Sequence, residues 1–214
     1  MKTGWLEHRG KWYYFGDDGR MHVGWLDWKG KKYLFKESGE MAAGEVAFYD
    51  GKRYAFSGKG DWLGEKRASF LDAYAKAAAY VNQYTDDSMT DIQKLRVCYD
   101  LFATFTEKNP WIPHYTGDDW VEVYANNCLD TCVSNCLGFG ASLGLMARVI
   151  GFDDVYCCNS GGHGWVEIAN LVYDPEWTLH HEGNFFGRPI VRGEKQDYSV
   201  AVNRSKEYWG YVRI

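Results

Sequence analysis

The stretch GWLEHRGKWYYFGDDGRMHVGW occupies residues 4–25 and holds one complete 20-residue unit followed by the start of the next. The Gly-Trp pair at its head returns as Gly24-Trp25, and glycine stands again at Gly44 and Gly64. Internal similarity at a period near 20 residues is typical of stacked arrays of small identical units. The sequence therefore predicts a repeat array over residues 1–64.

Each unit carries the same internal pattern, with a glycine in Arg9-Gly10 and Lys29-Gly30 that lies between two aromatic runs. Glycine supplies the positive φ of a tight turn, so each unit is predicted to be one β-hairpin. A single hairpin cannot bury its own apolar face, and the units must therefore stack. The recurring aromatics are Tyr13, Phe15, Tyr33, Phe35, Tyr54 and Phe56, with the third unit shifted internally by one residue.

Four segments of this unit, Gly4-Trp5, Lys11–Phe15, Gly19–Met21 and Gly24-Trp25, resemble the choline-binding, or cell-wall-binding, repeat of Gram-positive surface proteins. The resemblance implies a cell-wall polymer as partner, held between aromatic side chains of consecutive hairpins. Choline-bearing teichoic acid is one such polymer and a glucan is the alternative. Ring faces attract a desolvated quaternary ammonium by ~2 kcal/mol. The residues that match the cage positions are Trp5, Trp12, Met21 and Trp25.

The match weakens along the array. Lys32 and Arg53 stand where the first unit has Trp12, and Glu45 replaces the tryptophan of the Gly-Trp pair. A positive side chain at a cage position repels choline. In the second and third units we therefore expect the aromatic residues to hold the hairpins together.

The composition changes near Gly64. Residues 1–64 contain 12 of the 24 glycines, none of the four prolines and a charge of 11 − 9 = +2, whereas residues 65–214 carry 13 − 20 = −7. We therefore expect a second domain over residues 65–214. The net charge of −5 argues against nucleic-acid binding, and no apolar run is long enough to span a membrane.

The second domain begins with helical patterns. Apolar residues at helical spacing predict a helix over residues 69–84, and a Thr90…Gln93 capping box predicts the next one. A third helix is predicted from Cys136 to Ile150, with Gly151 as its C-terminal cap. The apolar face of the second helix is expected to carry Ile92, Leu95, Tyr99 and Phe102.

Short β-rich runs follow at residues 155–158, 164–168 and 171–173. Helices followed by an antiparallel sheet indicate an α+β domain behind an all-β hairpin array. The helix that starts at Cys136 contains three glycines, each of which costs ~1 kcal/mol relative to alanine. A close approach of another backbone is the usual reason for such a cost.

The candidate catalytic residues of the second domain are Cys136, His163 and Asp174. Cys136 begins a predicted helix, where free amides and the helix dipole favour a thiolate. His163 opens one strand and Asp174 ends the next, so hairpin pairing places the carboxylate beside the imidazole. A thiolate, a base and an orienting carboxylate are the groups that nucleophilic catalysis requires.

The flanking residues make the resemblance specific. Cys136 with Arg148 and Gly151, then His163-Gly164-Trp165, then Asp174-Pro175 resemble the transglutaminase-like superfamily of papain-type cysteine enzymes. The resemblance implies a papain-like fold with Cys136 as nucleophile, His163 as general base and acid, and Asp174 as orienter. It covers residues 132–177.

The oxyanion donor does not align with that family, which commonly has glycine where this chain has Ser134. Beside the amide of Cys136, side chains that could donate there or contact substrate are Asn126, Asn127, Asn135, Trp165, Trp120 and Tyr124. His114 is a weaker candidate base than His163.

The other cysteines and histidines have plainer interpretations. Cys128, Cys132 and Cys136, spaced by four, could share one helical face and hold a metal, but no fourth ligand is evident and no metal or cofactor is expected. Cys98 is expected in the core. Adjacent Cys157 and Cys158 are expected to pack on opposite faces of a strand. His180-His181 are expected in a loop.

Together these features predict an extracellular, wall-attached cysteine peptidase or amidase acting on a peptide or protein substrate through a thioester. A protein-crosslinking transglutaminase and a catalytically inactive wall-binding module are the alternatives. Met1-Lys2-Thr3 runs straight into the first Gly-Trp pair. No leader sequence is visible there, so export is inferred from the repeats alone.

Overall fold

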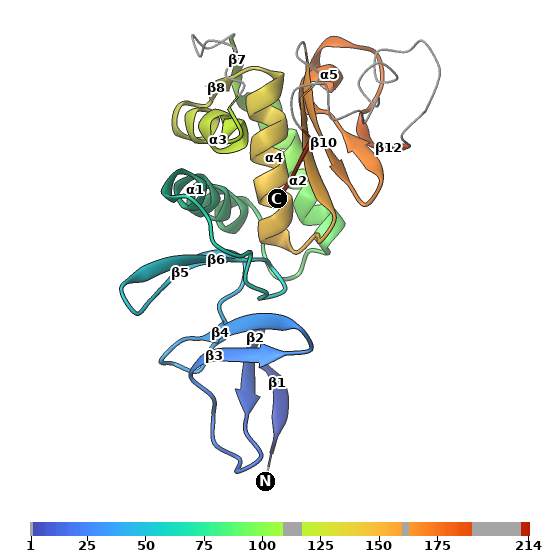
Figure 1. Ribbon diagram of the computed structural model, residues 1–214. Helices are drawn as coiled ribbons and strands as arrows, with labels where there is room; N and C mark the ends of the chain where they lie inside the picture. Colours follow the sequence, from blue (N-terminus) through green and yellow to red (C-terminus); the bar gives the residue numbers. More distant parts are fainter. Residues whose placement is uncertain (1, 109–116, 160–162, 190–210) are drawn as a thin grey trace.

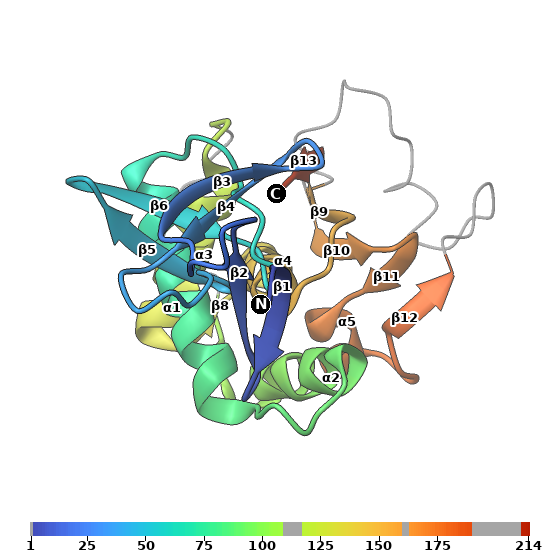
Figure 2. The same cartoon turned by 90° about the horizontal axis from the view of Figure 1, so that it is seen from below.

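The computed structural model describes residues 2–108, 117–159, 163–189 and 211–214. Three β-hairpins come first along the chain and are followed by a helical layer and an antiparallel sheet (Figure 1). Seen from the hairpin end, α4 runs through the middle, with α1 and α3 on one side and the sheet on the other (Figure 2).

The hairpins agree with the repeat pattern. They are β1 (Gly4–His8) with β2 (Lys11–Phe15), β3 (Gly24–Trp28) with β4 (Lys31–Phe35), and β5 (Glu45–Tyr49) with β6 (Lys52–Phe56). The turns are left-handed at both central positions, with φ of 52° at Arg9 and 71° at Gly10. Glycine was expected at such a position, whereas the positive φ of the residue before it was not evident from the sequence.

Backbone hydrogen bonds join successive hairpins at equivalent positions. The Met41 amide donates to the Trp12 carbonyl at 2.8 Å, and the Trp62 amide donates to the Lys32 carbonyl at 2.8 Å. The two acceptors are 20 residues apart, whereas the two donors are 21 apart. The extra residue therefore lies between Met41 and Trp62, in agreement with the one-residue shift inside the third unit. The stacking that the period predicts is confirmed.

The third unit packs against the helices. Tyr74 of α1 (Ala68–Tyr84) donates its hydroxyl proton to the Phe56 carbonyl at 2.9 Å, and the Gly58 amide donates to the Arg148 carbonyl at 3.0 Å. A Cβ at Gly44 would lie only 2.7 Å from the Val149 carbonyl oxygen. This unit therefore ends the hairpin stack and docks it onto the second domain.

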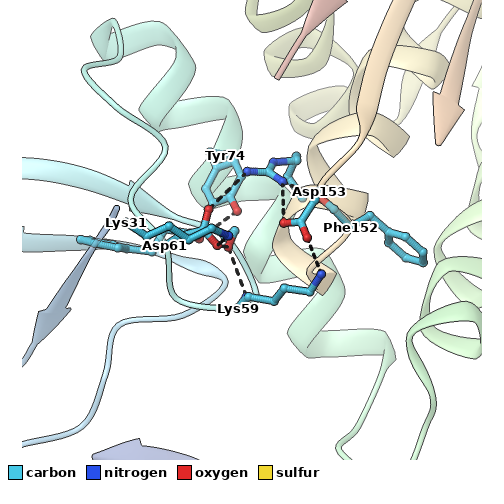
Figure 3. Close-up of polar contacts among 9 residues, drawn as sticks. Lys31, Lys59, Asp61, Tyr74, Phe152 and Asp153 are labelled. Atoms are coloured by element: carbon cyan, nitrogen blue, oxygen red, sulfur yellow. Dashed lines mark hydrogen bonds and ion pairs between the residues drawn. The ribbon is translucent and has the colours of Figure 1, made fainter. Parts of the chain in front are cut away.

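A buried arginine, Arg148, closes this junction. Figure 3 shows Lys59, Asp61 and Asp153, which surround it. The Arg148 guanidinium donates to the Phe152 carbonyl at 2.6 Å and lies 3.9 Å from a carboxylate oxygen of Asp61 and 3.7 Å from one of Asp153. Lys59 of the third unit also pairs with Asp153, at 2.5 Å. Charges from both parts of the chain neutralise one another here.

The predicted helices are present. They are α1, α2 (Asp91–Leu101), which continues into the 3-10 turn η1 (Phe102–Thr104), and α4 (Cys136–Ile150). Two further helices, α3 (Trp120–Thr131) and α5 (Pro175–His180), were not predicted. Both hydrogen bonds of the capping box at Thr90 and Gln93 form, and Gly151 caps α4.

Two expectations about the helices are wrong. Ile92 lies in the first turn of α2 with 47% of its surface exposed, because the apolar face of that helix runs through Leu95 and Tyr99. His180 and His181 do not lie in a loop. Asp174 and Pro175 start α5, which includes His180, and His181 caps its end and stacks on Trp177 at 3.9 Å between ring centroids.

The sheet has five antiparallel strands in the order β12 (Phe186–Pro189), β11 (Leu171–Tyr173), β10 (Gly164–Ile168), β9 (Val155–Asn159) and β13 (Tyr211–Arg213). A separate short parallel pair joins β7 (Thr106–Glu107) to β8 (Val133–Ser134). In the described residues, no helix has both the length and the hydrophobicity needed to cross a membrane. The α+β arrangement is confirmed.

Of the three glycines of α4, only Gly140 meets another backbone as their cost predicts, whereas Gly138 and Gly144 face the side chains of Ser134 and Cys157. A Cβ at Gly140 would lie 3.0 Å from the Trp165 backbone, and one at Gly164 would lie 2.7 Å from the Leu137 Cα. The third contact is with a side chain, since a Cβ at Gly144 would lie 2.5 Å from the Cys157 sulfur. Helix and strand therefore meet backbone to backbone at Leu137 and at Gly140.

Gly140→Ala tests this contact. Alanine normally stabilises a helix by ~1 kcal/mol relative to glycine. Here we expect a loss of about 1–3 kcal/mol in the free energy of unfolding, because the added methyl group overpacks the contact with β10. Urea denaturation measures the sign. Gly16→Ala is the control, because its φ is ordinary and its nearest neighbour is the flexible end of Asp18. A more stable Gly140→Ala protein would contradict the packing argument.

Candidate functional site

Cys136 is the first residue of α4 and is half-buried. The preceding residue, Asn135, is the N-cap, and its side-chain oxygen accepts from the Gly138 amide at 3.4 Å. The sulfur therefore sits at the positive end of a 15-residue helix whose first amides point toward it.

His163 lies immediately before β10, so the contact between Gly164 and the Leu137 backbone brings it to the start of α4. Its ring stacks on Trp165, with centroids 6.0 Å apart, and meets the edge of Trp177 at 4.9 Å. Two indole rings thus restrict the orientation of the imidazole.

Asp174 is fully buried and holds the other side of the imidazole. One carboxylate oxygen lies 2.5 Å from Nε2 of His163, and the other accepts from the Trp177 amide at 2.9 Å. The second bond exists because Asp174 is also the N-cap of α5. The local start of a short helix therefore orients the carboxylate toward the ring.

The three side chains that the sequence singles out are brought together. The Cys136 sulfur, a ring nitrogen of His163 and a carboxylate oxygen of Glu176 all lie within 4.8 Å of one another. Burial opposes protonation of His163, but the hydrogen bonds to Asp174 and Cys136 outweigh it and raise the pKa of the ring from 6.5 to about 10. A positively charged ring beside a sulfur favours the thiolate form.

Glu176 is a member of the site that sequence reasoning missed. One of its carboxylate oxygens lies 3.5 Å from Nδ1 of His163, and burial raises its pKa while the charge of His163 lowers it. The available signal was its position two residues after Asp174, in the first turn of a helix that Pro175 begins. Without that helix, its direction was not predictable.

The oxyanion candidates separate by location. Asn126 lies on α3 and contacts α1. Its side chain donates to the Ser69 carbonyl and accepts from Lys76. Asn127 lies on the same helix, α3, in its last turns. Asn135 adjoins the sulfur as the N-cap of α4.

The aromatic candidates are core residues. Trp120 and Tyr124 are buried within the main hydrophobic core. Trp165 is also buried, packs with Cys158 and Val172, and contacts His163. Its indole nitrogen makes no hydrogen bond within the described residues. Beside the amide of Cys136, Asn135 and Trp165 are therefore the candidates nearest the site. His114 lies outside the described residues.

The metal interpretation based on the four-residue cysteine spacing is wrong. Cys132 ends α3 in a left-handed conformation with φ of 53°, and β8 intervenes before Cys136 begins α4. Cys128, Cys132 and Cys136 therefore do not share a helical face. Cys98, Cys128 and Cys157 are buried in the main core, where burial raises the pKa of Cys98 and Cys128 to about 12. Cys158 packs on the opposite face of β9 from Cys157.

In the hairpins, Trp5 inserts between its own unit and the next. Its ring lies 6.2 Å from that of Trp12, 5.7 Å from Trp28 and 5.1 Å from Tyr33. Trp12 remains 41% exposed, so one indole of this cluster faces solvent. Trp28 and Tyr33 were not among the predicted cage residues.

Trp25 repeats the arrangement one layer further. Its ring meets Tyr54 at 5.0 Å and Trp62 at 5.7 Å. Met21 packs over Gly39, where a Cβ would lie 2.2 Å from its sulfur. The four predicted cage residues therefore do not form one cluster: Trp5 and Trp12 belong to the first layer and Trp25 to the second.

The substituted positions have their own partners. Lys32 pairs with Asp27 at 3.8 Å, Glu45 with Lys36 at 2.6 Å, and Arg53 with Asp72 of α1 at 2.6 Å. The last pair spans the two parts of the chain. Departures from the repeat thus serve contacts within the array and with the helices.

Comparison with known proteins agrees with the hairpin geometry. A family described as "Putative cell wall binding repeat" matches residues 3–21 and 23–41. The first two units are cell wall binding repeats. The third unit, residues 44–64, lies outside the two matched segments. No curated protein matches the chain.

Solved structures from Streptococcus pneumoniae are similar to about three tenths of this chain. A choline binding domain is 29% identical over 31% of this chain and 100% of its own length, with a TM-score of 0.29. Choline binding protein F is 33% identical over 28% of this chain and 21% of its own, with a TM-score of 0.26. CbpJ is 33% identical over 29% of this chain and 22% of its own, with a TM-score of 0.27. The chain thus spans about a fifth of the length of the last two proteins.

The raised pKa of His163 predicts a pH dependence. The folded ring has a pKa of about 10 against 6.5 without its partners, so its contribution to stability is complete below pH 6.5 and is lost as pH rises through about 10. Asp174→Asn removes the negative partner, and the ring pKa should fall. NMR titration of the ring protons measures it. An unchanged pKa in the variant would contradict the role of Asp174.

Proposed function

We propose that the chain is a wall-attached cysteine enzyme that attacks an amide or peptide carbonyl through Cys136. One observation carries the proposal: the sulfur at the start of α4 lies beside His163, whose other nitrogen is held by the buried carboxylate of Asp174. The repeats supply the attachment.

The chemistry follows from these positions. The Cys136 thiolate attacks the carbonyl carbon, and the proton held by His163 passes to the leaving amine as the C–N bond breaks. The products are a free amine and a thioester on Cys136. Water, deprotonated by His163, then hydrolyses the thioester and restores the thiol. A primary amine in place of water forms a new amide bond and gives a crosslink. We favour hydrolysis because it needs no site for a second substrate.

The ligand of the repeats is proposed to be choline carried by a wall polymer. Solved relatives of the array are named as choline binding proteins. The half-exposed face of Trp12 beside Trp5 suits a quaternary ammonium, which ring faces attract by ~2 kcal/mol. Lys32 and Arg53 occupy the equivalent place in the next two units, so we expect one choline site, in the first layer.

A wall-binding module without catalytic activity is the second candidate. It is favoured by the extent of the family match, which covers the first two hairpins and no part of the second domain. In that case Cys136 and His163 would be structural remnants.

Alkylation separates the two candidates. With limiting iodoacetamide, we expect Cys136 to be modified first, because a thiolate and not a thiol reacts, and we expect His163→Ala to slow its modification at least about tenfold. Peptide mapping by mass spectrometry identifies the cysteine. A burst of nitrophenol from p-nitrophenyl acetate, with an acetyl group trapped on Cys136, supports the enzyme.

Cys132→Ser is the matched control, since Cys132 is the other half-buried cysteine and should not change the modification of Cys136. Equal reactivity of Cys132 and Cys136, unaltered by His163→Ala, would favour the inactive module.

Retention on a choline resin tests the repeat ligand. We expect the protein to bind and to elute with free choline, and Trp12→Ala to weaken binding about thirtyfold, the equivalent of ~2 kcal/mol. Phe48→Ala is the control, because Phe48 is 72% exposed on the third hairpin, away from the first layer. Retention on dextran instead of choline would transfer the assignment to a glucan.

A further inference from the structure

Beside Cys136 and His163 the site holds a further donor, Glu176, that catalysis by Cys136, His163 and Asp174 does not require. The Cys136 sulfur, a ring nitrogen of His163 and a Glu176 carboxylate oxygen lie within 4.8 Å of one another. Cys136 begins α4, His163 precedes β10, and Glu176 lies in α5. Thiolate, imidazole and carboxylate are the ligand types that zinc takes in proteins, and three protein ligands with an open fourth position is a common zinc arrangement.

The surroundings of His163 favour a metal on one particular nitrogen. Nε2 faces the buried carboxylate of Asp174 at 2.5 Å, which leaves Nδ1 on the side of Glu176, at 3.5 Å. Histidines that bind metals usually donate their other ring N–H to a carboxylate, which fixes the tautomer and strengthens the ligand. Asp174 is itself held by the Trp177 amide.

We propose that Cys136, His163 and Glu176 form a binding site for Zn²⁺, with water as the fourth ligand. In a tetrahedral site with bonds of about 2.0–2.3 Å, neighbouring donors are roughly 3.5 Å apart. Nδ1 of His163 and Glu176 already have this separation. The sulfur lies within 4.8 Å of both donor atoms, so it is at most about 1.3 Å further from them than a tetrahedral site requires.

The consequence for activity rests on the proposed function. Zinc takes the sulfur lone pair and the ring nitrogen that attack and proton transfer need. The loaded protein is therefore unable to form the thioester, and a chelator restores it. The metal site itself stands on the three donors, whether or not the chain is an enzyme.

A neighbouring group shares Glu176 and competes for the assignment. Glu107, Glu176 and His180 also lie within 4.8 Å of one another, and His180 hydrogen-bonds to Glu107. This group lacks a thiol, and Glu107 is exposed. A metal bound there would therefore lack any bond to sulfur, which makes the two sites distinguishable by spectroscopy.

Cobalt and zinc titrations of the full chain test the proposal without measuring catalysis. We expect one equivalent of Co²⁺ to produce a thiolate-to-cobalt charge-transfer band, and one equivalent of Zn²⁺ to remove it. Asp174→Asn should weaken zinc binding about 10–100-fold through the tautomer of His163. Cys136→Ser should abolish the band, and Glu176→Gln should weaken binding by more than Asp174→Asn does.

Three matched variants serve as controls: Cys132→Ser, Glu182→Gln and Glu107→Gln should each leave the affinity and the band unchanged. Circular dichroism establishes that every variant is folded. Zinc binding that survives Cys136→Ser but is lost in Glu107→Gln would overturn the assignment in favour of the neighbouring group, and the absence of one-to-one binding would overturn it entirely. Loss of the alkylation pattern with retained zinc binding would remove the proposed enzyme and leave the metal site.

Discussion

The close contact between α4 and β10 is the constraint on which the site depends. Gly140 and Gly164 remove the side chains that would separate the helix from the strand, and each faces backbone of the other element. Cys136 precedes the first of these glycines by one helical turn, and His163 precedes the second by one residue. The same contact that packs the core therefore sets the distance between sulfur and imidazole, so the helical glycines serve the site as well as the fold.

Much of this arrangement could be predicted because its signals are local. The Gly-Trp period, the capping box at Thr90 and the Cys136–Gly151 helix each depend on residues close together in sequence. The role of Glu176 could not be predicted, because its side chain faces His163 only as part of a six-residue helix that Asp174 caps. The four-residue cysteine spacing allowed a shared helical face, which the structure excludes because the left-handed Cys132 breaks a period that looks continuous in the sequence. The grouping of the aromatic residues into two layers was also not predictable, because it depends on contacts between hairpins such as that of Trp5 with Trp28.

The third repeat unit shows how an array can end on a different domain. In the first two units, the tryptophan of the Gly-Trp pair inserts into the following hairpin. No fourth hairpin follows the third unit, and Glu45 takes that position and pairs with Lys36. Arg53 likewise faces Asp72 on α1. In the third unit, Glu45 and Arg53 thus replace aromatic residues where contacts with Lys36 and with α1 are made, whereas Lys32 of the second unit pairs within its own hairpin.

Helix α4 connects the two halves mechanically, because its ends serve different parts. Its first residue carries the sulfur. Near its last turn, the backbone carbonyl of Arg148 accepts from the Gly58 amide, and the Arg148 guanidinium faces Asp61 across the junction. A 15-residue helix is about 22 Å long, so the sulfur stands at a set height above the repeats. At this junction Arg148 and Asp61 are largely buried, and together they tie the end of α4 to the repeats. An enzyme built this way would reach substrates within a narrow distance of the polymer that its repeats bind, and a flexible linker would lose that restriction.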